Sequence, residues 1–208
     1  MRTRDMKQQI VKRILEHYKN PSVELDFSTP FELLIAAMLS ARYTDKKTNI
    51  VTKRLFSALH SPQDFVNAGE EKIKKYISSV SMYETKAKYI YGMCKILVSE
   101  YDGEVPKSRE ELIRLPGVGR KVANMVLSCA FSIPAISVDT HVARVAQRLS
   151  LSQQKKPEKI EEDLMHICPK EKWKDLYLGM ILLGRYICKA REPECEKCFL
   201  KDVCLEKK

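Results

Sequence analysis

The sequence lacks a hydrophobic run of the length that a membrane-spanning helix requires. Its most apolar stretch, Leu33–Leu39, is far shorter than the roughly 20 residues that cross a bilayer, so it predicts a buried core helix. The first residues, Met1–Asp5, lack the features of a secretory signal and lead into a polar amphipathic helix. We therefore expect a protein that is not secreted and has no membrane partner.

Alternating polar and apolar residues, the pattern of a half-buried strand, are also missing, as are internal repeats and low-complexity segments. Apolar residues recur at helical spacing instead. A capping box of Thr29 and Glu32, with Pro30 at the first helical position, opens a core helix that should run to about Ala41. Towards the C-terminus, helices are expected near residues 140–149, 157–168 and 170–187. The predicted fold class is all-α, formed by packing such helices against one another.

The cysteine content does not fit a secreted disulfide scaffold. There are seven cysteines, an odd number. Cys94, Cys129 and Cys168 lie within apolar helical patterns, where we expect them to act as small core side chains. A reducing cytosol is the expected location.

Acidic residues are fewer than basic ones. The 27 Asp and Glu stand against 37 Lys and Arg, which gives a formal net charge of +10. Such a balance fits either a soluble basic protein or a protein that binds a polyanion. The charge agrees with nucleic-acid binding but does not by itself decide between these two. The length of 208 residues suits one or two domains with ample core.

The most informative segment, Leu115–Lys121, reads Leu-Pro-Gly-Val-Gly-Arg-Lys. A short helix capped by Ser108 should end near Leu115, because proline follows. Gly117 and Gly119 then allow a tight turn, and a second helix begins near Gly119. The first amides of that helix, at the positive end of its dipole, form a phosphate site.

Lys121 lies in the first turn of that second helix. The apolar stripe of the helix includes Val122, Val126 and Leu127, and at about 100° per residue Lys121 falls nearly opposite its centre. A solvated surface lysine would fit the same pattern. The adjacent phosphate-type turn favours a functional role. Asp139, eighteen residues later, precedes an apolar helix and is predicted to be its N-cap.

The C-terminal cysteines Cys188, Cys195, Cys198 and Cys204 have the spacing C-x6-C-x2-C-x5-C. Four thiolates suit either a tetrahedral zinc ion or a [4Fe–4S] cluster, and the spacing alone keeps both open. Zinc sites usually contain two CxxC pairs, whereas this segment has one. A structural role is favoured, because the site would cross-link a short tail that has little core of its own.

The hairpin segment, followed by Val-Asp-Thr-His at residues 138–141, resembles the helix-hairpin-helix DNA glycosylases, and the endonuclease III family in particular. The resemblance runs from Phe27 to Cys204. It implies two helical lobes: a helical barrel over residues 23–134, and a cluster domain of residues 1–22 plus 135–208. Lys121 and Asp139 would lie on opposite lips of a groove between the lobes.

The resemblance also implies an activity. The family members are bifunctional glycosylases and abasic-site lyases that act on oxidised pyrimidines in double-stranded DNA, after flipping the nucleotide out of the helix. Lys121 would attack the sugar and form an imine, and Asp139 would assist it. The four C-terminal cysteines would hold a [4Fe–4S] cluster. The protein is expected to be a monomer in the cytoplasm, associated with the nucleoid.

The residues expected to contact DNA are those of the hairpin, His141, Arg42 and Met82. The hairpin residues Gly117, Val118, Gly119 and Arg120 would hold phosphate. His141, one turn along from Asp139, would support the site or serve only as a surface cap.

Two positions depart from the family pattern. Arg42 follows Leu-Ser-Ala, where the family commonly has the glutamine that fills the gap left by the flipped base. Met82 stands where a leucine wedge is common, and methionine is still an apolar wedge. Arg42 therefore bears on the choice of the opposite base.

Two other functions remain compatible with the sequence. One is a mismatch-specific thymine or uracil glycosylase on the same scaffold, which the presence of Lys121 disfavours. The other is a non-catalytic module that binds DNA or senses redox state.

Overall fold

The computed structural model describes residues 3–206, which divide into two compact units. The first unit joins the described residues up to Val23 to those from Ile133 onward, and the second runs from Glu24 to Ser132. The described residues form helices and turns and no β-strand, which confirms the all-α prediction. No helix among residues 3–206 is both long and apolar enough to cross a membrane.

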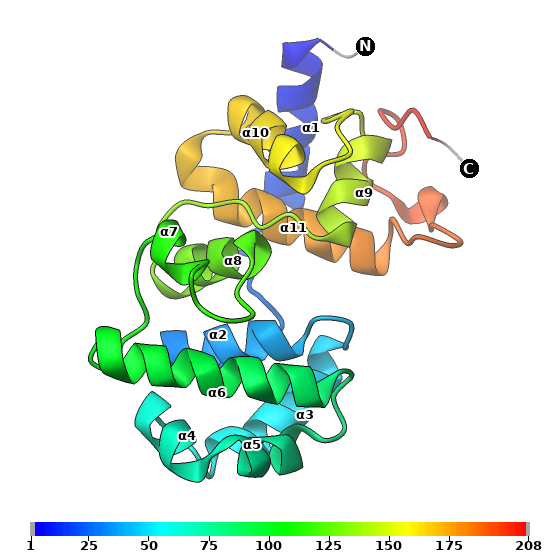
Figure 1. Cartoon of the computed structure of the whole chain (residues 1–208). Helices are drawn as coiled ribbons and strands as arrows, with labels where there is room; N and C mark the ends of the chain where they lie inside the picture. Colours follow the sequence, from blue (N-terminus) through cyan, green and yellow to red (C-terminus); the bar gives the residue numbers. More distant parts are fainter. Residues whose placement is uncertain (1–2, 207–208) are drawn as a thin grey trace. The chain divides into compact units, whose positions relative to one another are not determined.

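The second unit is built around its first helix. It contains α2 (Pro30–Leu39), α3 (Asp45–Phe56), α4 (Pro62–Ala68), α5 (Glu70–Ile77), α6 (Tyr83–Glu100), α7 (Arg109–Leu112) and α8 (Arg120–Ala130). On α2, Phe31 and every residue from Leu33 to Leu39 are buried, and the helix packs against α3, α6 and α8 (Figure 1). The expected core helix is therefore confirmed.

Local signals account for both ends of α2. The Thr29 side chain accepts a hydrogen bond from the Glu32 amide at 3.2 Å, and Pro30 occupies the first turn. The helix ends at Leu39, short of the expected Ala41. Ser40 is its C-cap, and the chain then turns and passes through Arg42, which has a left-handed backbone with φ of 58°.

The first unit is built around its last α-helix. It contains α1 (Arg4–His17), α9 (Thr140–Arg148), α10 (Pro157–Ile167), the 3₁₀ helix η1 (Lys170–Lys172), α11 (Trp173–Tyr186) and the 3₁₀ helix η2 (Cys195–Lys197). Helix α11 packs against α1 and α9 (Figure 1). A Cβ at Gly179 would lie 3.1 Å from Ile14 Cγ2, so glycine permits the close approach of α11 to α1. The single helix expected over residues 170–187 is in fact divided into η1 and α11.

Helix α1 also holds the C-terminal tail. The Arg13 guanidinium pairs with the Asp202 carboxylate at 2.8 Å, and the His17 ring stacks on Phe199 with centroids 3.9 Å apart. These contacts join the two ends of the chain within one unit. The cysteines outside the tail follow the prediction in part: Cys94 and Cys168 are buried, whereas Cys129 is partly exposed.

Candidate functional site

The hairpin before α8 is a tight turn packed on its own unit. Gly117 has φ of 78°, and the Val118 amide donates to the Leu115 carbonyl at 3.1 Å. A Cβ at Gly117 would lie 2.8 Å from Met38 Cε and 2.9 Å from Tyr89 Cβ. Glycine is therefore required here both by the backbone conformation and by close contact with α2 and α6.

The N-terminus of α8 has the features of an anion site. Gly119 is the exposed N-cap, no side chain within the described part of the chain caps it, and no acidic residue lies in its first turn. The first amides of a helix have no intrahelical acceptor and lie at its positive end. Arg120 and Lys121, both half-buried, follow directly. The arrangement suits a phosphate next to a lysine amine.

Asp139 caps α9, as the sequence predicted. Its Oδ1 accepts hydrogen bonds from the amides of His141 at 2.9 Å and Val142 at 2.8 Å. Both of these bonds use the same carboxylate oxygen. The carboxylate is half-buried, so one oxygen is used to hold the side chain in place while the other can accept a proton.

His141 belongs to a packed network within its unit. Its Nδ1 lies 3.1 Å from Arg144 Nη2, and a Cβ at Gly184 would lie 2.9 Å from His141 Cβ. Arg144 also donates to the Gly184 carbonyl at 2.7 Å and to the Cys188 carbonyl at 3.0 Å. Burial lowers the pKa of Arg144, while the nearby charge of Cys188 acts in the opposite direction. These contacts favour a structural role for His141.

Lys121 and Asp139 belong to different units: Lys121 lies in the unit that ends at Ser132, and Asp139 in the unit that resumes at Ile133. Lys121 lies in the first turn of α8, and Asp139 is the N-cap of α9. The groove expected between them stays a prediction.

Arg42 and Met82 lie in the same unit and share an unusual backbone. Their φ angles are 58° and 59°, in the left-handed region, and both residues are exposed. Met82 is the N-cap of α6, and 56% of its surface is exposed, so its apolar side chain is accessible to a partner. Sequence reasoning missed Lys86, a buried residue of α6 that bonds to the Ala41 carbonyl before Arg42 and to the Met82 carbonyl. Its place beside Ala87 and Ile90 in an apolar helical stripe was the available signal.

The four C-terminal cysteines line one cavity. They share it with Arg148, Leu149, Leu183, Ile187, Pro193, Lys201 and Glu206. All four thiols are partly buried, and none forms a disulfide. No group of three or more His, Cys, Asp or Glu side chains in the described part of the chain is arranged to hold a metal ion directly. The thiols nevertheless surround a common space with largely apolar walls, which suits a cluster with thiolate ligands.

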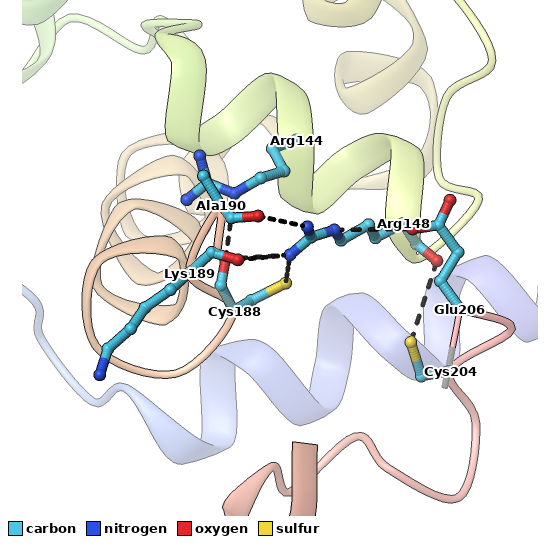
Figure 2. Close-up of polar contacts among 7 residues, drawn as sticks. All are labelled: Arg144, Arg148, Cys188, Lys189, Ala190, Cys204 and Glu206. Carbon is cyan, nitrogen blue, oxygen red and sulfur yellow. Dashed lines mark hydrogen bonds and ion pairs between the residues drawn. The ribbon is translucent and has the colours of Figure 1, made fainter. Parts of the chain in front are cut away.

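Arg148 ties the cysteine loop to α9 (Figure 2). Its Nη1 donates to Cys188 Sγ at 3.3 Å and to the Lys189 carbonyl at 2.7 Å. Its Nη2 donates to the Ala190 carbonyl at 3.2 Å, and its Nε lies 3.5 Å from a Glu206 carboxylate oxygen. One guanidinium thus satisfies several acceptors at the start and end of the loop. This role of Arg148 was not predicted from sequence.

Basic residues of the loop are paired with acidic residues of the loop. Lys189 and Lys197 both bond to Glu194, and these hydrogen bonds lower the pKa of Glu194 to about 2. Lys201 bonds to Glu196. These three lysines of the loop therefore have acidic partners within the loop itself.

Comparison with known proteins identifies the family of this chain. Residues 35–170 match the family described as HhH-GPD superfamily base excision DNA repair protein. The chain is 45% identical over 203 residues to endonuclease III of Rickettsia conorii. The matched segment covers 96% of this chain and 97% of that protein. The chain is 43% identical over 196 residues to endonuclease III of Escherichia coli K12, covering 94% and 93% respectively. For endonuclease III of Bacillus subtilis the identity is 44%, covering 93% and 89%.

Solved structures give the same result. An endonuclease III in a trapped covalent intermediate with DNA, an estranged-adenine complex, superposes with a TM-score of 0.95 at 43% identity, covering 99% of this chain and 97% of that one. A thermostable thymine-DNA glycosylase has a TM-score of 0.87 at 24% identity, which indicates a shared fold alone. The chain therefore belongs to the endonuclease III family, within the HhH-GPD superfamily of base excision DNA repair proteins.

Proposed function

We propose that this glycosylase and abasic-site lyase removes oxidised pyrimidines from double-stranded DNA and cuts the strand through an imine on Lys121. The observation that carries the proposal is the position of Lys121, in the first turn of an uncapped helix directly behind the Gly117 turn. A phosphate held by that helix would bring the sugar to the amine. The likeness to an endonuclease III trapped covalently on DNA supports a covalent route.

The chemistry follows from an amine and a carboxylate. The Lys121 amine bonds to the sugar carbon that carries the base; the bond to the base breaks, and the base leaves with a proton. The sugar ring opens as the imine forms. Loss of a proton from the neighbouring carbon then expels the 3′ phosphate and nicks the strand. Water hydrolyses the imine and releases Lys121.

Asp139 would accept the proton from the amine and stabilise positive charge that develops on the sugar. Its two bonds to the α9 amides both use Oδ1, so Oδ2 is the oxygen proposed for this role. The hairpin residues Gly117, Val118, Gly119 and Arg120 would hold the phosphate, and Arg42 and Met82 would enter the gap left by the flipped base.

Borohydride trapping tests this proposal. The wild-type protein should form a covalent adduct on a duplex that contains thymine glycol, and Lys121→Gln should lose trapping and nicking but keep much of its phosphate-driven binding. Asp139→Asn should lose rate more than affinity, because asparagine still caps α9 but cannot accept the proton. Trapping by Lys121→Gln at the wild-type rate would identify another amine as the nucleophile.

The substrate class is tested separately. A panel of duplexes should be scored for base release and for nicking, with thymine glycol, oxidised cytosine, a G·T mismatch and a preformed abasic site as its members. We expect activity on the oxidised pyrimidines and the abasic site. Base release from the G·T mismatch alone would support the thymine glycosylase alternative.

We also propose that Cys188, Cys195, Cys198 and Cys204 hold a [4Fe–4S] cluster. All four line one cavity, which supports the assignment. Bound there, the cluster would cross-link the tail to α9 and α11 and supply a structural role rather than a catalytic step. Protein purified without oxygen should be yellow-brown and contain iron. Stoichiometric zinc without iron would overturn the proposal.

Because the substrate is DNA, we propose that the protein works on the nucleoid in the cytoplasm. A fluorescent fusion should co-localise with a DNA stain, and an even cytoplasmic signal would contradict this.

A further inference from the structure

Lys86 is a buried lysine whose ammonium group has specific partners. Only 8% of its surface is exposed, and its Nζ donates to the carbonyls of Leu39 and Ala41, both at 2.8 Å. Burial lowers the pKa of Lys86. A charged group taken out of water needs hydrogen-bond partners to remain charged, and these two carbonyls provide them.

The two acceptors lie at the end of α2 and just beyond it: Leu39 is the last residue of the helix, and Ala41 follows its C-cap. The last carbonyls of a helix lack intrahelical donors and lie at the negative end of its dipole. Helix α2 has no basic residue in its own last turn, so Lys86 supplies from α6 the cation that stabilises this end. The Ala41 carbonyl belongs to the peptide bond that leads into Arg42. The Lys86 ammonium therefore holds the peptide plane from which the left-handed Arg42 continues.

Lys86 is also joined to Met82. Its backbone amide donates to the Met82 carbonyl at 3.0 Å, which is the first hydrogen bond of α6. Lys86 thus bonds to both exposed turns. Its side chain binds the Ala41 carbonyl just before Arg42, and its backbone amide binds the Met82 carbonyl. Left-handed conformations of such residues persist only where the surroundings hold them in place.

We propose that Lys86 is a positioning residue that holds Arg42 and Met82 as one rigid pair for insertion into the damaged duplex. The proposal rests on the function proposed above for Arg42 and Met82. Without the ammonium group, the turn after α2 loses two hydrogen bonds, and Arg42 no longer has a fixed direction relative to Met82. Binding of a duplex with a flipped-out nucleotide should weaken. The reaction at Lys121 should persist, because Lys121 lies on a different helix, α8.

The test measures the affinity of a set of variants for a duplex that contains a lesion. Lys86→Met removes the donors at similar side-chain length, and Lys88→Met is the matched control, because Lys88 is exposed on the same helix. We expect Lys86→Met to weaken binding about tenfold, within the range for directly coupled neighbours, and Lys88→Met to have a much smaller effect. In an Arg42→Ala, Met82→Ala background, Lys86→Met should weaken binding no further.

Two additional measurements separate positioning from general stability. Amide exchange at Tyr43, whose amide donates to the Ser40 carbonyl at 3.0 Å, should speed up in Lys86→Met and not in Lys88→Met. Lys86→Arg, which keeps the charge and donors, should restore affinity. If Lys86→Met does not fold, Lys86→Gln replaces it in the same set of variants, and a partial loss of affinity is expected.

Equal weakening by Lys86→Met in both backgrounds, or no weakening in either, would overturn the positioning role. The proposed function fails differently. If the Arg42→Ala, Met82→Ala protein binds the lesion duplex as tightly as the wild type, these two residues do not read DNA, whatever Lys86 does.

Discussion

The guanidinium of Arg148 lies 3.3 Å from the sulfur of Cys188, although the two residues are 40 positions apart in the sequence. Arg148 is the last residue of α9, the helix that Asp139 caps, and Cys188 begins the cysteine loop. The same Nη1 donates to the Lys189 carbonyl at 2.7 Å (Figure 2). The loop is therefore anchored to α9 by a charged donor, and not only by the proposed cluster.

The first prediction concerns this anchor. Arg148→Met should lose iron more readily and unfold at a lower urea concentration, because hydrogen bonds to a charged group are lost and the loop carbonyls are left without their donor. The expected cost is about 2 kcal/mol. Iron content per protein and the urea midpoint measure it. Arg191→Met, at an exposed arginine of the same loop, is the control. Equal iron retention by Arg148→Met and the control would contradict the anchoring role.

The second prediction concerns Gly117. Gly117→Ala should be less stable for two reasons. Its φ of 78° is unfavourable for alanine, and the new Cβ would lie 2.8 Å from Met38 Cε. Gly103→Ala is a matched control, since Gly103 has φ of 79° and nothing within 4 Å of the added Cβ. The control should lose about 1–2 kcal/mol from conformation alone, and Gly117→Ala clearly more.

Duplex affinity completes this test. Only Gly117→Ala should bind undamaged duplex more weakly, because the turn before α8 shifts. Thermal unfolding and a salt-dependent binding assay provide the two readouts, and matching results for both variants would show that close packing at Gly117 does not matter.

The third prediction concerns the base opposite the lesion. If Arg42 enters the gap, its guanidinium offers only donors, which match the O6 and N7 acceptors of guanine better than the edge of adenine. We expect the ratio of base release opposite guanine to that opposite adenine to fall by about tenfold in Arg42→Gln, within the discrimination of a bidentate contact. An unchanged ratio with a weaker salt dependence would mean that Arg42 contacts phosphate.

The fourth prediction concerns thiol reactivity. Burial raises the pKa of Cys168 to about 12 and also raises the pKa of Cys94, so both thiols should react slowly with a thiol reagent near neutral pH. With the four proposed ligands bound to iron, the partly exposed Cys129 should account for most of the rapid labelling. After the iron is removed with a chelator, the four ligand thiols should be labelled as well. Mass spectrometry of labelled peptides checks each site, and rapid labelling of Cys94 in the loaded protein would contradict the expected protection.

Much of the local structure could be predicted from sequence because its causes are local. Thr29 and Asp139 cap their helices through side chains that reach amides two or three residues ahead. The run Leu33–Leu39 is buried as its composition indicates. The turn at Gly117 follows from proline and glycine chemistry. Each of these depends on neighbours in the chain, and the pattern of residue types therefore carries the information.

Other features were decided only by the tertiary structure. Residue types did not predict that Lys86 would be buried, because its acceptors, Leu39 and Ala41, lie 47 and 45 residues away along the chain. The contact of Arg148 with Cys188 arises in the same way, across 40 residues. The contact of Lys86 with the Ala41 carbonyl, just before the left-handed Arg42, likewise joins α6 to the segment after α2. A lysine or arginine in a helix is compatible with solvent or with burial, and only the carbonyls that another helix brings within hydrogen-bonding distance decide between them.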